Sequence, residues 1–138
     1  MTTHRTFTRT LARTTAAVTL ATAVGVTAAG AAQASGGGPR VITTGSCSAG
    51  ADWKMKAKED DGRIEVESEV DSNRNGQTWT WTLKHDGSLS AKGTAKTTGP
   101  SGSFSIERRT VDGEGTDTFV FRAKNARSGE VCLGTVSF

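Results

Sequence analysis

The sequence predicts an all-β protein: an antiparallel sandwich of about seven short strands that follows an N-terminal signal peptide. Two observations carry this prediction. From Ala51 onward, apolar residues recur with a period of two, and no stretch has the period of an amphipathic helix. Turn residues, above all Gly, separate these alternating stretches at short intervals, as they do in small sandwiches.

Residues 1–34 have the composition of a secretory signal peptide. A positive start is followed by an apolar stretch of small residues over 16–32 and by a small-x-small cleavage site, Ala32-Gln33-Ala34. The basic residues of the start are Arg5, Arg9 and Arg13. We therefore expect cleavage after Ala34 and a secreted, extracellular protein of about 104 residues. Because Thr and Gly interrupt the apolar stretch and no sorting motif follows, we expect no membrane anchor.

Loss of this segment changes the charge of the protein. The whole chain carries 17 Lys and Arg against 14 Asp and Glu, a net charge of +3. Residues 1–34 hold three of the basic residues and none of the acidic ones, which leaves 14 of each sign in the exported part. A neutral protein lacks the excess positive charge that drives binding to nucleic acid or anionic membranes, so we expect neither partner.

The exported part is expected to form one domain over residues 47–138, behind a flexible lead-in of residues 35–46 that begins Ser-Gly-Gly-Gly-Pro. It contains two cysteines, Cys47 and Cys132. An even number in an oxidising compartment predicts a disulfide, which joins the start of the domain to its last strand. A redox or metal role for these thiols is disfavoured, since the chain has no CxxC motif.

The first predicted hairpin surrounds Asp61-Gly62, the residue pair preferred in a two-residue type I′ turn. With this pair at the tip, three lysines align with three glutamates on one face, and mostly apolar residues align on the other. The pairs are Lys58 with Glu65, Lys56 with Glu67 and Lys54 with Glu69, and then Ala57 with Val66, Met55 with Ser68 and Trp53 with Val70. We interpret the charged ladder as a solvated face rather than a docking surface, because its charges neutralise one another.

Later strands follow at short spacing, each with alternating apolar residues. The expected strands cover residues 77–84, 89–96, 103–109 and 117–124 and a last stretch from Cys132 to Phe138. Asp86-Gly87 forms the turn before the second of these, whose Lys, Gly and Ser content indicates a sheet edge. The expected loops and turns cover residues 97–102, 111–116 and 125–129.

Between residues 115 and 129, an acidic corner precedes an aromatic residue, alternating core residues, an Ala-x-Asn sequence and a Gly turn. The residues concerned are Gly115, Asp117, Phe119, Phe121, Ala123, Asn125 and Gly129. This pattern resembles strand F and the F–G turn of immunoglobulin-like domains. The resemblance implies an immunoglobulin-like sandwich in which Trp79 or Trp81 matches the core tryptophan of strand C.

Two departures from that pattern stand out. Phe119 replaces the corner tyrosine, so the hydroxyl hydrogen bond of that tyrosine is missing. Phe121 replaces the strand-F cysteine, and the expected disulfide uses the last strand instead. The chain is also similar to small uncharacterised secreted proteins of streptomycete-type actinobacteria. That similarity implies export and a β-domain and carries no activity with it.

Asp71, Asn73, Asn75 and Gly76 are spaced like the start of a calcium loop, in which alternate oxygen side chains converge on the ion and Gly permits the bend. The helix–loop–helix form needs an acid at the twelfth position, where this chain has Thr82. The favoured alternative is an Asx-rich turn that tolerates left-handed backbone. The sequence therefore predicts no cofactor, with calcium as the one candidate that stays open.

Trp79 and Trp81, with Trp53, are candidates for a platform that stacks on sugar rings. The spacing of Trp79, Trp81 and Leu83 is also that of the buried face of a strand, which is the favoured interpretation.

Residues suited to catalysis are few. His85, Asp86 and Ser88 lie in one turn and cannot point at a common substrate as a triad does. The acids of the hairpin, Glu65, Glu67 and Glu69, are expected on an exposed ladder where nothing desolvates them. We therefore expect no enzyme activity.

The sequence thus favours a secreted, monomeric, non-catalytic module that binds an extracellular protein or glycan. Two alternatives stay open. One is a protease inhibitor that presents Arg108 or Arg109 near the loop of residues 97–102 or 111–116. The other is a carbohydrate-binding module that uses Trp79 and Trp81.

Overall fold

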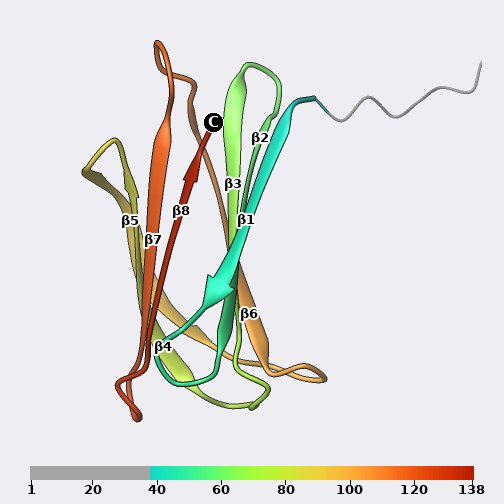
Figure 1. The fold of residues 1–138 in the computed structure, drawn as a ribbon, viewed down its shortest axis with the longest axis vertical. Helices are drawn as coiled ribbons and strands as arrows, with labels where there is room; N and C mark the ends of the chain where they lie inside the picture. Colours follow the sequence, from blue (N-terminus) through green and yellow to red (C-terminus); the bar gives the residue numbers. More distant parts are fainter. Residues whose placement is uncertain (1–37) are drawn as a thin grey trace, which may run out of the picture. The chain divides into compact units, whose positions relative to one another are not determined.

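The computed structural model describes residues 38–138, so the predicted signal peptide lies outside the described residues. Eight antiparallel strands form two four-stranded sheets that pack face to face as a sandwich (Figure 1). The strands are β1 (Arg40–Ser46), β2 (Asp52–Glu59), β3 (Arg63–Asp71), β4 (Thr78–His85), β5 (Ser88–Lys96), β6 (Ser103–Val111), β7 (Thr118–Asn125) and β8 (Val131–Ser137). This part of the chain contains no helix, and hence none that could cross a membrane.

The first sheet has the strand order β1-β2-β3-β6, and the second has the order β5-β4-β7-β8. Across the sandwich, β8 packs on β1 and β2, β7 on β3, and β5 on β6. Alternate residues of each strand point into the space between the sheets, as the period of two requires. The core contains Met55, Ala57, Ile64, Val66, Val70, Trp79, Trp81, Leu83, Phe104, Phe119, Phe121, Ala123, Cys132 and Val136.

The hairpin of β2 and β3 has the predicted register. Lys54 lies opposite Glu69, Lys56 opposite Glu67 and Lys58 opposite Glu65. Asp61 and Gly62 have φ values of 51° and 71°, as a type I′ turn requires. The flanking backbone groups of Asp60 and Arg63 bond to each other in both directions, at 2.7 and 3.1 Å. A slip of one residue would bury the lysines, so the charge pattern and the turn fix the same register.

The predicted lead-in needs correction, because its second half forms β1. Residues 40–46 pair with β2 along their whole length, from Arg40 opposite Lys58 to Ser46 opposite Asp52. Val41, Ile42 and two threonines give this segment a β-branched composition that suits a strand. The sandwich therefore has eight strands rather than about seven. As predicted, β5 lies at a sheet edge.

The charged ladder is also less exposed than predicted. The side chain of Glu65 is only 8% exposed, and the Lys58 Nζ lies 2.9 Å from its Oε1. On the other side, β6 places Arg109 opposite Glu65, with the Arg109 Nε 4.0 Å from Oε2. Two cations from neighbouring strands thus cover this carboxylate. The prediction of an exposed Glu65 was wrong because β6 is distant in sequence.

Cys47 and Cys132 form the predicted disulfide. Cys47 directly follows β1, and Cys132 lies in β8, so the bond ties the first sheet to the second. Cys132 is fully buried, and Cys47 packs against the same core.

Candidate binding site and the polar clusters

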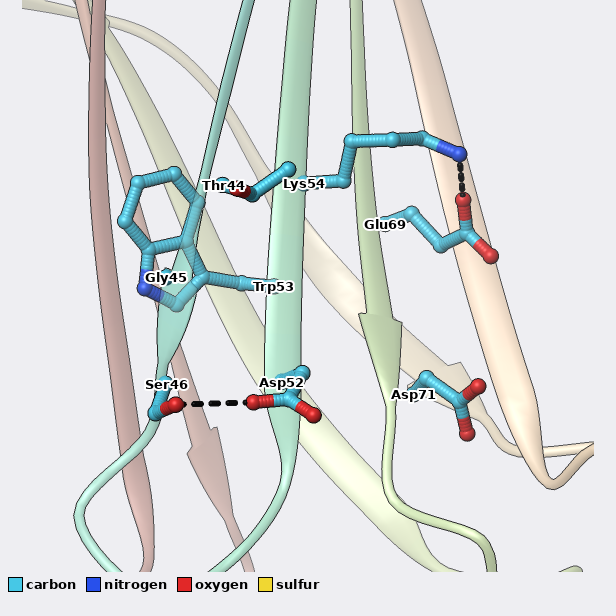
Figure 2. A pocket seen from close by; sticks show the side chains of 8 residues that line it. All are labelled: Thr44, Gly45, Ser46, Asp52, Trp53, Lys54, Glu69 and Asp71. Atoms are coloured by element: carbon cyan, nitrogen blue, oxygen red, sulfur yellow. Dashed lines mark hydrogen bonds and ion pairs between the residues drawn. The ribbon is translucent and has the colours of Figure 1, made fainter.

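Trp79 and Trp81 lie in the core rather than on an exposed platform. Trp79 is fully buried and Trp81 is 5% exposed. The guanidinium of Arg108 covers Trp81, with its Cζ 5.2 Å from the ring centroid. The half-buried ring of Trp53 lies across Gly45 of β1, as Figure 2 shows, and against Gly134 of β8. Because Trp79 and Trp81 are buried, neither has a free ring face on which a sugar could stack.

The two arginines considered for protease inhibition, Arg108 and Arg109, both belong to β6. Arg109 forms an ion pair with Asp60, and Arg108 is held over Trp81. Neither side chain therefore projects from the loop of residues 97–102 or from the loop of residues 111–116. This placement gives the inhibitor hypothesis no support.

The three residues considered as calcium ligands lie at the end of β3 and in the loop that follows it. The carboxylate Oδ1 of Asp71 accepts the backbone N–H of Asn73 at 3.0 Å, and Asn73 has a φ of 54°. Asp71 and Asn75 line two different pockets of the protein. The local geometry is that of an Asx turn.

The pocket that includes Asp71 lies over β1, β2 and β3 and has a volume of about 430 Å³ (Figure 2). Its lining includes one cation, Lys54, and three carboxylates. The Lys54 Nζ lies 2.5 Å from Glu69 Oε2, and the Ser46 hydroxyl donates to Asp52 Oδ1 at 2.9 Å. The ion pair of Lys54 and Glu69 is one of the three pairs of the charged ladder. Asp52 and Asp71 lie opposite each other and form no ion pair with any residue between 38 and 138, so this pocket carries negative charge.

A larger pocket, of about 780 Å³, lies between the β3–β4 loop and the β7–β8 turn. It carries two arginines, Arg74 and Arg127, and no acidic residue. Neither guanidinium makes an ion pair with any residue between 38 and 138. The lining residues are Arg74, Asn75, Gly76, Gln77, Thr78, Asn125, Ala126, Arg127 and Ser128. We call this the arginine pocket.

Side-chain hydrogen bonds fix both segments of the arginine pocket. The buried Thr97 hydroxyl donates to the carbonyl of Arg74 at 2.6 Å and accepts the N–H of Gln77 at 2.9 Å. The Oδ1 of Asn125 accepts the N–H groups of Arg127 and Ser128 at 2.9 and 3.0 Å. Because of these bonds, the backbone on either side of the pocket is held in place before any ligand arrives.

Asn125 also has a buried donor without a partner beside the pocket. The residue is 1% exposed, and its Nδ2 has no acceptor among the residues described. A buried donor without a partner costs about 1–3 kcal/mol. The Nδ2 atom has no exposed surface, so the guanidinium groups of the two arginines are the charged donors that a ligand in the pocket can reach.

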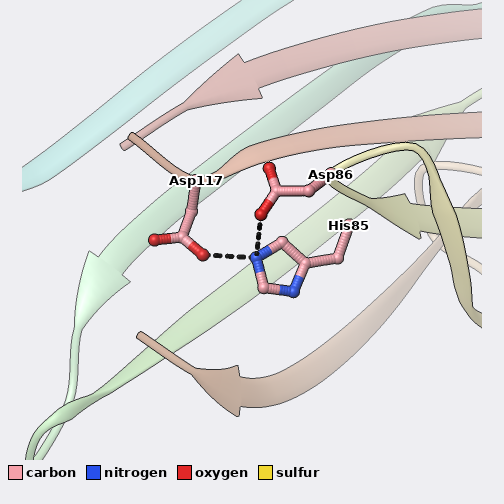
Figure 3. Close-up of side chains that lie close together, drawn as sticks. All are labelled: His85, Asp86 and Asp117. Atoms are coloured by element: carbon pink, nitrogen blue, oxygen red, sulfur yellow. Dashed lines mark hydrogen bonds and ion pairs between the residues drawn. The ribbon is translucent and has the colours of Figure 1, made fainter. Parts of the chain in front are cut away.

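A third cluster lies at the opposite end of β4, where His85, Asp86 and Asp117 meet (Figure 3). His85 ends β4 and Asp117 precedes β7, and the pairing of these strands sets His85 opposite Phe119. The His85 Nε2 makes a hydrogen bond with Asp117 Oδ1 and lies 3.3 Å from Asp86 Oδ2. Stacking of the imidazole on Phe119, with centroids 4.5 Å apart, fixes the plane of the ring.

Sequence reasoning missed Asp117 as a partner of His85. Alternation identifies strands but does not say which strands are neighbours. The one signal was the immunoglobulin-like resemblance, because strands C and F are adjacent in that fold. No family model, curated protein or solved structure matches this chain.

Proposed function

We propose that this protein is a secreted, non-catalytic module of immunoglobulin-like type that binds carboxylate groups of an extracellular protein in the arginine pocket. The observation that carries the proposal is a pocket with two unpaired guanidinium groups, no acid and a backbone held in place on either side. Export rests on the signal-peptide pattern of residues 1–34 and fits a domain closed by a disulfide.

The strand order supports the immunoglobulin-like assignment. In that fold, strand B pairs with A and E, and strand F pairs with C and G. Here β3 pairs with β2 and β6, and β7 pairs with β4 and β8. With β2 as A and β5 as the added strand C′, β1 extends the first sheet by one strand.

Under this correspondence, the two segments of the arginine pocket are the B–C and F–G loops. Variable domains bind their ligands with these loops, at one end of the sandwich. Fold analogy alone does not license a function. It is the charge and the rigidity of the loops in this chain that favour the same use here.

The chemistry favours a carboxylate partner. The planar fork of a guanidinium matches the two oxygens of a carboxylate and donates two parallel hydrogen bonds to it. A volume of about 780 Å³ falls in the range of small-ligand sites, about 300–1,000 Å³. The pocket therefore has room for one or two acidic side chains of a partner.

Backbone amide chemical shifts, followed during titration with a pentaglutamate peptide at low salt, test this proposal. We expect the shifts to concentrate at residues 74–78 and 125–128. The double variant Arg74→Ser, Arg127→Ser should bind the peptide at least tenfold more weakly. A matched control, Arg40→Ser with Arg122→Ser, removes two exposed arginines outside the pocket and should leave the affinity unchanged.

Equal loss of affinity in both double variants would contradict the proposal, because it would show an effect of net charge alone. Shifts centred on β1, β2 and β3 would move the binding site to the other pocket. Tighter binding of a sulfated polysaccharide than of the peptide would indicate that the partner is a glycan and not a protein. Export is tested separately by N-terminal sequencing of protein from the medium, which should begin at Ser35.

A further inference from the structure

We propose that His85, Asp86 and Asp117 bind a divalent first-row transition-metal ion, of which zinc is the natural probe. The ligand atoms are His85 Nε2, Asp86 Oδ2 and Asp117 Oδ1 (Figure 3). These donors lie within 4.8 Å of one another. The site is independent of the arginine pocket, because β4 begins with Thr78 at that pocket and reaches His85 about 23 Å further on.

The first argument is that two carboxylates converge on one ring nitrogen. An imidazole nitrogen carries at most one hydrogen, which a single acceptor satisfies. Asp117 and Asp86 nevertheless both point at the His85 Nε2. A doubly charged ion with several open coordination positions satisfies all three groups together, which one proton cannot do.

The second argument is that the remaining polar atom of each ligand is already held. The Thr110 hydroxyl lies 3.3 Å from the His85 Nδ1, so it can accept the Nδ1–H when an ion displaces the hydrogen that Nε2 donates to Asp117. Asp86 Oδ1 accepts the N–H of Thr118 at 2.8 Å, and Asp117 Oδ2 accepts the N–H of Gly113 at 3.2 Å. Supporting hydrogen bonds of this kind orient the ligands of metal sites.

The spacing of one ligand pair and the exposure of the cluster fit a tetrahedral ion. Two ligands of a zinc ion with bonds of about 2.1 Å lie about 3.4 Å apart. The His85 Nε2 and the Asp86 Oδ2 are 3.3 Å apart. The Nε2 and the Asp117 Oδ1 are closer, in direct hydrogen-bond contact, so these two atoms must move apart to hold the ion. The side chain of Asp117 is 2% exposed, while that of Asp86 is 56% exposed. One side of the cluster thus faces the core and the other is open to water, which can supply a fourth ligand.

The donor set points to the class of ion. Calcium and magnesium prefer sites made only of oxygen ligands. An imidazole with two carboxylates suits zinc and its first-row neighbours. The metal site therefore differs in place and in chemistry from the calcium loop considered at Asp71, Asn73 and Asn75.

The test uses the protein purified without a histidine tag, freed of metal with a chelator and titrated with Zn²⁺ by calorimetry. We expect one zinc per chain. The variants His85→Gln and Asp86→Asn should each weaken binding at least tenfold. The matched control Asp112→Asn removes an exposed acid between β6 and β7 and should bind as the parent does.

Asp117 is buried, so its replacement tests folding as much as binding. Thr110→Val therefore serves as the second variant: it removes only the supporting hydroxyl and should weaken zinc binding about 10- to 100-fold. A Co²⁺ derivative gives an independent readout, because tetrahedral coordination produces intense visible absorption. Absence of zinc binding in the parent protein, or undiminished binding in His85→Gln, would overturn the proposal.

Discussion

The carboxylate of Glu130 accepts a hydrogen bond from the backbone N–H of Ala51, with Oε1 2.7 Å from the nitrogen. The same oxygen accepts the N–H of Ala49 at 3.1 Å. Glu130 lies two residues before Cys132 and is 8% exposed, while Ala49 and Ala51 follow Cys47. One buried side chain thus fastens the β1–β2 loop to the start of β8, beside the disulfide.

Replacing Glu130 by Ala should therefore lower the free energy of unfolding by about 1–3 kcal/mol, because two N–H groups lose their acceptor. Urea unfolding followed by tryptophan fluorescence measures this loss. Glu114→Ala removes an exposed acid from the loop after β6 and serves as the control. A similar unfolding midpoint for the two variants would refute the role of Glu130.

Loss of the disulfide should cost more than any single hydrogen bond. The bond joins cysteines 85 residues apart, and closing a loop of this length stabilises a protein by about 4–5 kcal/mol in the chain-entropy model. We expect the variant Cys47→Ser, Cys132→Ser to unfold at a much lower urea concentration. Reduced parent protein should match it, and a reductant should leave the variant unchanged.

The ring of Trp53 leaves no room for a side chain at Gly45 or Gly134, which lie against it. A Cβ at position 134 would lie 2.7 Å from the Trp53 Cε3 and 2.9 Å from the Met55 Sδ. Gly134→Ala should therefore destabilise the protein by about 1–3 kcal/mol through overpacking. In a double-mutant cycle, Trp53→Leu should recover part of this loss, since it removes the ring that the new methyl group meets. Additive effects of the two changes would argue against this contact.

The ladder lysines should make the fold sensitive to alkaline pH. A hydrogen bond to Glu69, with the attraction of its charge, raises the pKa of Lys54 above the ordinary value of 10.5. A hydrogen bond to Glu65 raises the pKa of Lys58 in the same way. A raised pKa in the folded state means that the stabilisation is fully present below 10.5 and is lost as the pH rises through the folded values.

Urea unfolding at a series of pH values up to about 11.5 measures this dependence. The variant Lys54→Met, Lys58→Met should lose less stability above about pH 10.5 than the parent does. The control Lys92→Met, Lys96→Met changes two exposed lysines of the edge strand β5 and should follow the parent curve. Identical curves for the two double variants would show that the ladder is not the cause.

Local rules were enough to predict most of the fold. Asp61-Gly62 and the alternation of Lys with Glu fixed one hairpin to the residue, because turn type and side-chain period act on neighbouring residues. β1 was missed although Val41 and Ile42 favour a strand. The Gly-rich residues before it indicated a linker, and only pairing with β2 shows that the segment is part of the sheet.

Sites that join distant strands could not be predicted in this way. Glu65 is buried because Arg109 arrives from β6, and His85 meets Asp117 because β4 pairs with β7. The arginine pocket likewise needs Arg74 and Arg127 to lie at the same end of the sandwich. Each of these contacts depends on strand order, and the alternation of apolar and polar residues does not reveal strand order.

The disulfide has a topological consequence as well as an energetic one. Strands β2 to β7 all lie between Cys47 and Cys132, within a closed covalent ring. A protease that cuts any loop inside this ring produces a nicked molecule whose two pieces remain linked. On a non-reducing gel the nicked protein still runs as one band, and only a reductant separates the fragments. The strand β1 alone lies wholly outside the ring, so it is the strand that a single cut, between Ser46 and Cys47, can release.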